Sequence, residues 1–164
     1  MCIRDRPFAI PKSCDWRLLR EEPLIVLTRG PAASRKPHAI LASEPFIRLN
    51  RGTWEGRLID GYLRKAGIRP RERFEIDGIE AITVMVDRGL GVSLLPDWAP
   101  PWPEGLKVAK LPVPDPSFAR RIGLVWARSS LRLRLVHAFV QQAVAARERG
   151  QPGRKANSKT PARK

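Results

Sequence analysis

The sequence predicts an α/β fold with a largely parallel sheet. Short apolar segments rich in Val, Ile and Leu alternate along the chain with longer segments whose apolar residues recur at helical spacing. Glycines, prolines and polar residues separate these segments, and strands that alternate with helices are typical of layered α/β domains. With 43% hydrophobic residues in a chain of 164, there is enough apolar surface for one core, which excludes a wholly disordered protein.

The first predicted strand covers residues 23–28, Pro-Leu-Ile-Val-Leu-Thr, and the second covers residues 45–49. Residues 39–43 between them are expected to form one helical turn. Residues 1–22 show no clear period, so no element is predicted there. The first six of these residues lead into no recognisable element, and we treat them as a candidate non-native segment.

A helix over residues 53–66 is predicted to follow the turn at residues 50–53, with Thr53 as its N-cap. Gly56 and Gly61 inside it each cost about 1 kcal/mol relative to alanine, which suggests that close packing requires them. The helix presents one apolar stripe, formed by Trp54, Leu58, Ile59, Tyr62, Leu63 and Ala66.

Residues 73–76 are predicted to form a short strand, and the next helix starts directly after it. Asp77 and Glu80 have the N-cap and N3 spacing of a capping box. The helix is expected to run to Val86 and to end at Gly89.

The remaining strands are predicted at residues 91–95, 106–111 and 121–126, the first of them ended by Pro96. Prolines exclude a strand or helix at residues 98–103. A final helix, capped by Ser129 or Ser130, reaches residue 146 along one apolar stripe.

The chain carries 31 Lys and Arg against 16 Asp and Glu, a formal charge of +15, which first points to nucleic acid or an acidic membrane surface. Residues 147–164 hold seven of the basic residues and one acidic residue, and we predict a disordered basic tail there. The other basic residues are scattered, as on an ordinary solvated surface.

Several classes of protein are not supported by the sequence. No segment approaches the roughly 18 consecutive apolar residues of a membrane span, and no export signal is visible, so a cytoplasmic protein is expected. Cys2, Cys14, His38 and His137 lack metal-ligand spacing. No phosphate-binding loop or nucleophile motif is present, so no enzyme, metal or cofactor is predicted.

The best candidate ligand site is the strand-to-helix turn formed by Asn50, Arg51, Gly52 and Thr53. In open α/β sheets, ligands bind beyond the carboxyl ends of the strands. A helix N-terminus there offers backbone N–H groups and a partial positive charge suited to a carboxylate. Arg51 could add a charge-assisted hydrogen bond. The alternative for this turn is an ordinary capped helix start.

Four segments together resemble the effector-binding region of LysR-type transcriptional regulators. They are Glu22-Pro-Leu-Ile-Val-Leu27 with Pro45-Phe-Ile47, the helix end Leu63-Arg-Lys-Ala-Gly67, and Val86-Asp-Arg-Gly-Leu-Gly-Val-Ser-Leu-Leu-Pro96. Arg121-Ile-Gly-Leu-Val-Trp126 and the last helix follow in the family's order, so that the resemblance covers about residues 15–146.

The resemblance implies a type 2 periplasmic-binding-protein-like effector domain with two Rossmann-like subdomains and a ligand between them. Residues 23–127 would be the second subdomain and residues 128–146 the C-terminal helix. Most of the first subdomain and the winged helix-turn-helix would be missing, with residues 1–22 as a residual segment and residues 147–164 as the tail.

By position, the resemblance carries effector binding onto Asn50, Arg51, Gly52 and Thr53, and more weakly onto Asp77, Gly78, Ile79 and Pro96. It implies a small-molecule effector, a carboxylate in our interpretation, and promoter DNA bound by the missing N-terminal domain. The intact protein is expected to be a homo-oligomer, with the outer face of helix 53–66 as one candidate dimer surface.

Two other classes of function remain open at this point. A type 2 periplasmic solute-binding protein would share the fold but would normally carry an export signal. A basic protein that binds nucleic acid through residues 147–164 would show a DNA affinity that falls with salt and is lost with the tail.

Overall fold

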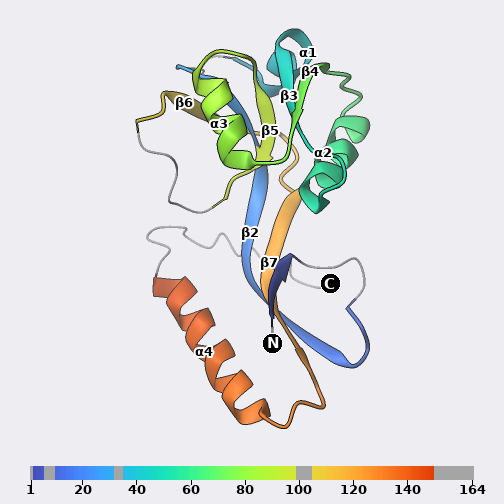
Figure 1. Ribbon diagram of the computed structural model, residues 1–164, viewed down its shortest axis with the longest axis vertical. Coiled ribbons are helices and arrows are strands. Elements are labelled where there is room, and N and C mark those ends of the chain that lie inside the picture. Colours follow the sequence, from blue (N-terminus) through green and yellow to red (C-terminus); the bar gives the residue numbers. More distant parts are fainter. Residues whose placement is uncertain (1, 6–9, 32–34, 99–104, 150–164) are drawn as a thin grey trace, which may run out of the picture. The chain divides into compact units, whose positions relative to one another are not determined.

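The computed structural model describes residues 2–5, 10–31, 35–98 and 105–149 (Figure 1). The chain divides into two units, residues 21–122 and residues 1–20 with 123–164. The two long strands, β2 (Cys14–Arg29) and β7 (Ala119–Ala127), each contain a boundary between the units. Each unit has its own hydrophobic core. Within the described residues, no helix is long and apolar enough to cross a membrane.

The larger unit contains a mixed sheet. β3 (Pro45–Leu49) pairs in parallel with β4 (Arg71–Ile76), and Phe46 forms a parallel bridge to Val92, next to β5 (Ser93–Pro96). β2 pairs antiparallel with β5 and with β6 (Val108–Pro112). Through the bridge at Val92 the order is β4-β3-β5-β2, and both β6 and β7 also pair with β2, which runs against β3, β4, β5 and β6. The predicted largely parallel arrangement is therefore present in this unit, with β2 as its antiparallel member.

Three helices of the larger unit bury their apolar faces in one core: α1 (Pro37–Ser43), α2 (Trp54–Lys65) and α3 (Ile79–Asp87). The helices α2 and α3 connect β3 to β4 and β4 to β5, as crossovers between parallel strands require. The fully buried residues of this core include Leu24, Leu27, Ile40, Leu41, Phe46, Ile47, Ile59, Ile82, Leu94 and Leu95.

The smaller unit contains β1 (Cys2–Asp5), the start of β2, the end of β7 and the helix α4 (Leu133–Arg149). Leu124, Trp126 and Val136 form its buried core. The two long strands approach closely here, because a Cβ on Gly123 would lie 2.3 Å from the carbonyl oxygen of Arg17.

The prediction that residues 1–22 hold no element is wrong, because β1 and the first half of β2 lie there. Most side chains of residues 14–21 are only partly buried, so that the sequence shows no apolar alternation in this half of β2. The predicted strand start at Pro23 is also too late, because the strand already begins at Cys14. In the structure, Pro23 lies inside the strand, and Leu24 N–H donates to the carbonyl of Phe118 at 3.0 Å.

Two local predictions are also corrected by hydrogen bonding. The N-cap of α3 is Gly78 rather than Asp77, and it makes no side-chain cap hydrogen bond. The helix α4 begins at Leu133, because Ser130 Oγ accepts from Arg132 N–H in a turn that precedes the helix. The prediction of a disordered tail falls mostly on residues 150–164, which lie outside the described residues.

We predict that Gly56→Ala lowers the free energy of unfolding by about 1–3 kcal/mol, the usual cost of overpacking. A Cβ at this position would lie 2.1 Å from the carbonyl oxygen of Asn50, so either the turn or the helix must move. Urea denaturation of both proteins measures the difference.

The matched control is Gly61→Ala in the same helix, where the nearest atom to a new Cβ is a Phe118 ring carbon at 3.4 Å. Alanine's better helix propensity should leave this variant as stable as the parent or up to about 1 kcal/mol more stable. Equal losses in both variants would contradict the close-contact explanation.

Candidate functional site

The predicted site residues gather at one edge of the sheet. Residues 50–53 follow β3, residues 77–79 follow β4, and Pro96 ends β5. Because β3, β4 and β5 are parallel neighbours, their carboxyl ends lie side by side. The helices α2 and α3 both begin at this edge, so that two helix N-termini with partial positive charge are brought there.

Asn50 holds this edge together. Its backbone N–H donates to the carbonyl of Ile76 at 3.0 Å, which extends the pairing of β3 with β4. Its side-chain amide donates to Asp77 Oδ1, and its Oδ1 accepts from Gly52 N–H at 2.6 Å. Asn50 therefore joins the turn before α2 to the turn before α3.

Thr53 caps α2, as the sequence predicts. Its hydroxyl donates to the carbonyl of Asn50 at 2.7 Å and accepts from Gly56 N–H at 3.0 Å. The hydroxyl proton is thus already used within the turn. The turn is closely packed, since Gly56 lies where no Cβ could fit against Asn50.

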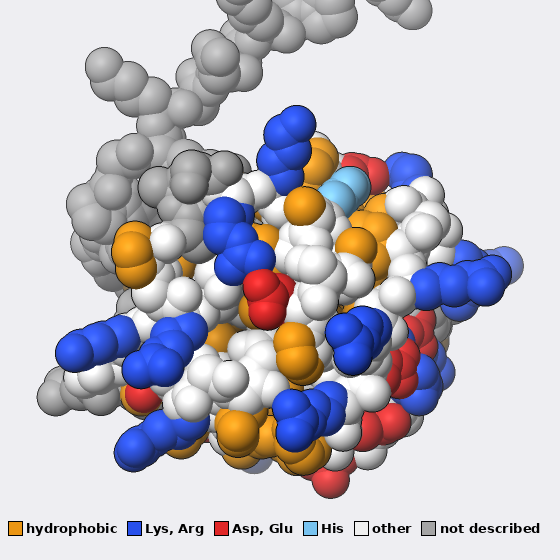
Figure 2. All heavy atoms as spheres, turned by 90° about the horizontal axis from the view of Figure 1, so that it is seen from above, with side chains coloured by type: hydrophobic (Ala, Val, Ile, Leu, Met, Phe, Trp, Pro, Cys, Tyr) orange, Lys and Arg blue, Asp and Glu red, His pale blue; other side chains and the backbone are white. Residues whose placement is uncertain are grey.

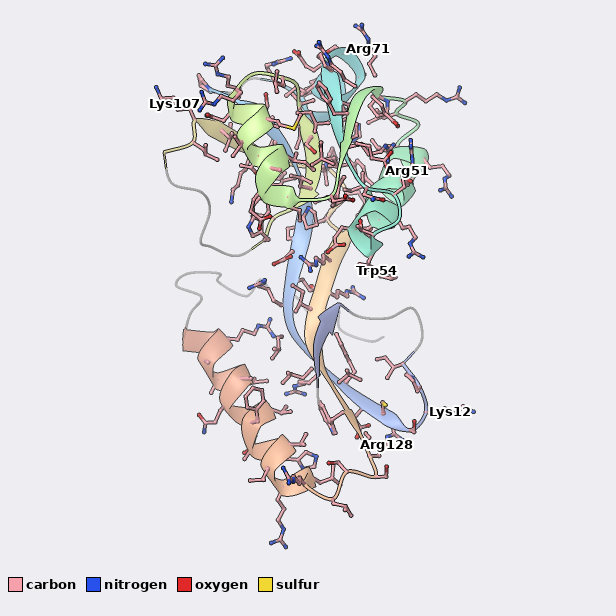
Figure 3. The ribbon with its side chains drawn as sticks, viewed as in Figure 1. Lys12, Arg51, Trp54, Arg71, Lys107 and Arg128 are labelled. Atoms are coloured by element: carbon pink, nitrogen blue, oxygen red, sulfur yellow. The ribbon has the colours of Figure 1, made fainter. Side chains whose placement is uncertain are left out.

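Arg51, labelled in Figure 3, forms salt bridges with carboxylates on β4. Its Nη2 lies 2.7 Å and 2.8 Å from the two carboxylate oxygens of Glu72, and its Nη1 lies 3.4 Å from Glu75. Its backbone N–H also donates to Glu75 at 3.1 Å. These carboxylates already compensate the charge of Arg51 and use both of its terminal nitrogens as donors.

Arg48 is the main residue that sequence reasoning missed. It lies in β3 with only 4% of its side chain exposed, and its guanidinium bonds to Asp60 on α2 and to Glu72, the latter at 2.6 Å. Burial alone would lower the pKa of Arg48, but the hydrogen bonds with Glu72 and Asp60 outweigh it and raise the pKa. The available signal was an arginine inside the apolar segment Pro45-Phe-Ile-Arg-Leu49.

A second ionic group lies at the start of α2. Arg120 on β7 contacts Glu55 at 3.1 Å and Glu22 on β2 at 3.5 Å. The side chain of Glu22 is fully buried, although its place beside Glu21 in the sequence is typical of a surface residue. The position of Glu22 directly before the apolar segment at residues 23–28 does not predict this burial.

The first turn of α3 is the part of this edge best suited to bind an anion. Gly78 caps it without a side chain, and the backbone N–H groups of residues 79–81 precede the first donor that bonds within the helix, Ile82 N–H to Gly78 at 3.1 Å. Asp77 next to it is exposed and can accept hydrogen bonds from hydroxyl groups.

Among the described residues, no group of three or more His, Cys, Asp or Glu side chains could hold a metal ion.

Comparisons with known proteins identify the class of this fold. The chain aligns with the regulatory domain of CcmR from Synechocystis PCC6803, solved in complex with 2-PG, with a TM-score of 0.71 and 18% identity, over 90% of this chain and 73% of that one. It aligns equally with the effector-binding domain of QuiR in complex with shikimate, with a TM-score of 0.68 and 17% identity, over 90% of this chain and 72% of that one. The fold is therefore that of effector-binding domains of the type 2 periplasmic-binding-protein-like class.

A family model described as the LysR substrate binding domain matches residues 1–148. The chain is also 33% identical over 139 residues to the uncharacterized HTH-type transcriptional regulator YybE of Bacillus subtilis (strain 168), an alignment that covers 79% of this chain. The chain belongs to the LysR substrate-binding domain family. It spans 45% of the length of this curated relative.

We predict that Glu72 makes folding stability depend on pH in the acid range. The hydrogen bond from Arg48 lowers the pKa of Glu72 below 4.5, against the opposing effect of partial burial, and Arg51 adds to the lowering. A carboxyl whose pKa is lower in the folded state stabilises the fold above its unfolded pKa, and this contribution disappears as the pH falls through the folded pKa.

Urea unfolding can be measured at a series of pH values from about 6 down to about 2. As the pH falls, Glu72→Gln should lose less of its free energy of unfolding than the parent does. Glu80→Gln, which removes an exposed carboxylate that has no arginine partner within the described residues from the first turn of α3, is the control and should change the acid slope less than Glu72→Gln does. If the slopes of all three proteins coincide, the assigned role of Glu72 is wrong.

Proposed function

We propose that this chain is the ligand-sensing part of a LysR-type transcriptional regulator that acts in the cytoplasm. In this proposal, the intact protein binds promoter DNA through a helix-turn-helix domain, functions as a homo-oligomer, and changes transcription when a small molecule binds. Family membership and the similarity to a helix-turn-helix regulator support this function over that of a solute-binding protein. The role is one of binding rather than catalysis.

The observation that carries the proposal is the meeting of three parallel strand ends and two helix N-termini at one edge. The proposed effector site comprises Asn50, Arg51, Gly52, Thr53, Asp77, Gly78, Ile79 and Pro96. The proposed effector is a small hydroxycarboxylate, and shikimate, the ligand of the similar QuiR domain, has this chemistry.

The roles proposed within the site follow from the hydrogen bonds that are already made. The carboxylate of the effector binds the backbone N–H groups at the first turn of α3, because no side chain caps Gly78 there. Asp77 accepts from a hydroxyl group of the effector. Arg51 positions the turn through Glu72 and Glu75, and Asn50 links that turn to Asp77.

The proposal predicts that deleting one backbone donor at α3 weakens effector binding. Ile79→Pro removes the N–H group of the first helical position, where proline is well tolerated and where the preceding Gly78 is already extended at φ −108° and ψ 127°. Titration calorimetry with a panel of small hydroxycarboxylates that includes shikimate identifies a binding compound. For that compound, the loss of one charge-assisted hydrogen bond should reduce affinity about tenfold.

Ile79→Ala is the control, since it removes the same side chain but keeps the N–H group. Its affinity should stay within about threefold of the parent. Equal losses in both variants would assign the effect to the Ile79 side chain instead, and binding by no member of the panel would contradict the hydroxycarboxylate class.

A further inference from the structure

A pocket outside the proposed effector site lies toward the C-terminal end of α2. It has a volume of about 310 Å³, at the lower end of the range of small-molecule sites. It lies between α2, the loop that follows this helix and the start of β4, and all the residues that line it belong to the larger unit. The proposed effector site lies instead at the N-terminus of α2 and beyond the carboxyl end of β4.

The buried guanidinium of Arg48 lines the inner part of this pocket. Its side chain is 4% exposed, and its two terminal nitrogens bond to Asp60 and Glu72. Its Nε is among the described buried atoms that make no hydrogen bond. Buried polar groups are almost always hydrogen-bonded, so that this donor marks a place where a ligand can supply the missing acceptor.

Two further arginines bring positive charge to the pocket. Arg64 lies in the last turn of α2 and Arg69 in the loop that follows, and both are exposed. Within the described part of the chain, neither of them forms an ion pair. The carboxylates of the lining are already compensated, because Asp60 bonds to Arg48, and Glu72 bonds to Arg48 and to Arg51. The pocket therefore favours an anion.

The apolar side of the pocket consists of Leu63, Ile68 and Pro70. The end of α2 holds it in place, because Gly67 has a φ of +66° and Ile68 N–H donates to the carbonyl of Leu63 at 2.9 Å. This is the hydrogen bond of a Schellman motif, in which the residue after the glycine packs against the last turn of the helix. Apolar surface and free cations thus lie side by side in one pocket.

We propose that this pocket binds a small phosphate monoester. The phosphate group pairs with Arg64 and Arg69, because planar guanidinium groups match phosphate oxygens with paired hydrogen bonds. One phosphate oxygen accepts from Arg48 Nε, and the organic part of the ligand packs on the apolar side. A doubly charged phosphate fits better than a single carboxylate, since two free cations face the same space. The site does not depend on the proposed effector site.

The test titrates the full 164-residue chain with phenyl phosphate, by calorimetry and by the ¹⁵N-resolved Nε–H signal of Arg48. This signal, assigned through its side-chain correlations, should move downfield and saturate as a phosphate oxygen reaches it. Arg64→Gln and Arg69→Gln, changes at exposed residues, should each weaken the affinity about tenfold. Inorganic phosphate should bind more weakly than phenyl phosphate, because it lacks a group that packs on the apolar side.

Arg57→Gln is the matched control and should bind phenyl phosphate as the parent does. It removes an exposed arginine from the first turn of the same helix, next to the turn at residues 50–53, and it does not line the pocket. The proposal fails if the Arg48 signal does not shift, if Arg57→Gln weakens binding as much as the other two changes do, or if inorganic phosphate binds as tightly as phenyl phosphate.

Discussion

The buried guanidinium of Arg48 is the constraint on which the candidate site depends. A charge with 4% of its side chain exposed is tolerated only when it is paired, and its partners come from two other elements, Asp60 on α2 and Glu72 on β4. These bonds fix both elements against β3, the strand that leads into the turn at residues 50–53. Glu72 then also binds Arg51 of that turn, so that one carboxylate joins the buried charge to the exposed edge. Removing Glu72 would leave Arg48 with one carboxylate partner and would also take the main support of Arg51 from the turn.

The same network changes the role expected of the polar side chains at the turn. From the sequence, Arg51 and Thr53 are natural partners for a carboxylate, because both stand at a helix N-terminus. In the structure, Thr53 uses its hydroxyl to cap α2, and Arg51 is held by Glu72 and Glu75. These side chains therefore give the turn one shape, and the binding groups that are left are backbone amides and Asp77. In the proposed site, a ligand would meet donors that are already oriented and need little reorganisation.

The sequence predicted what depends on local pattern. Thr53 was recognised as an N-cap from its place before an apolar stripe, and Gly89 was recognised as a helix end that the structure gives a φ of +76°. The features that the sequence did not predict depend on contacts between residues far apart in the chain. Glu22 looks like a surface residue beside Glu21, yet Arg120, nearly a hundred positions later, makes its burial possible. Asp77 and Glu80 match a capping box, but Asn50 takes the carboxylate of Asp77 and leaves Gly78 as the cap. Long-range partners of charged groups cannot be derived from spacing along the chain.

The net charge of the chain and the chemistry of its candidate site act at different ranges. Lys and Arg side chains are spread over the surface rather than gathered in one patch, as Figure 2 shows for one face. A scattered excess of positive charge attracts any anion over about a Debye length and does not distinguish one from another. At the turn, Glu72 and Glu75 neutralise the arginine that could have bound an anion unselectively. Under the proposed function, discrimination would come from backbone donors with fixed directions and from the acceptor Asp77. The arrangement of hydroxyl and carboxylate groups on a ligand, more than its charge, would then decide whether it fits.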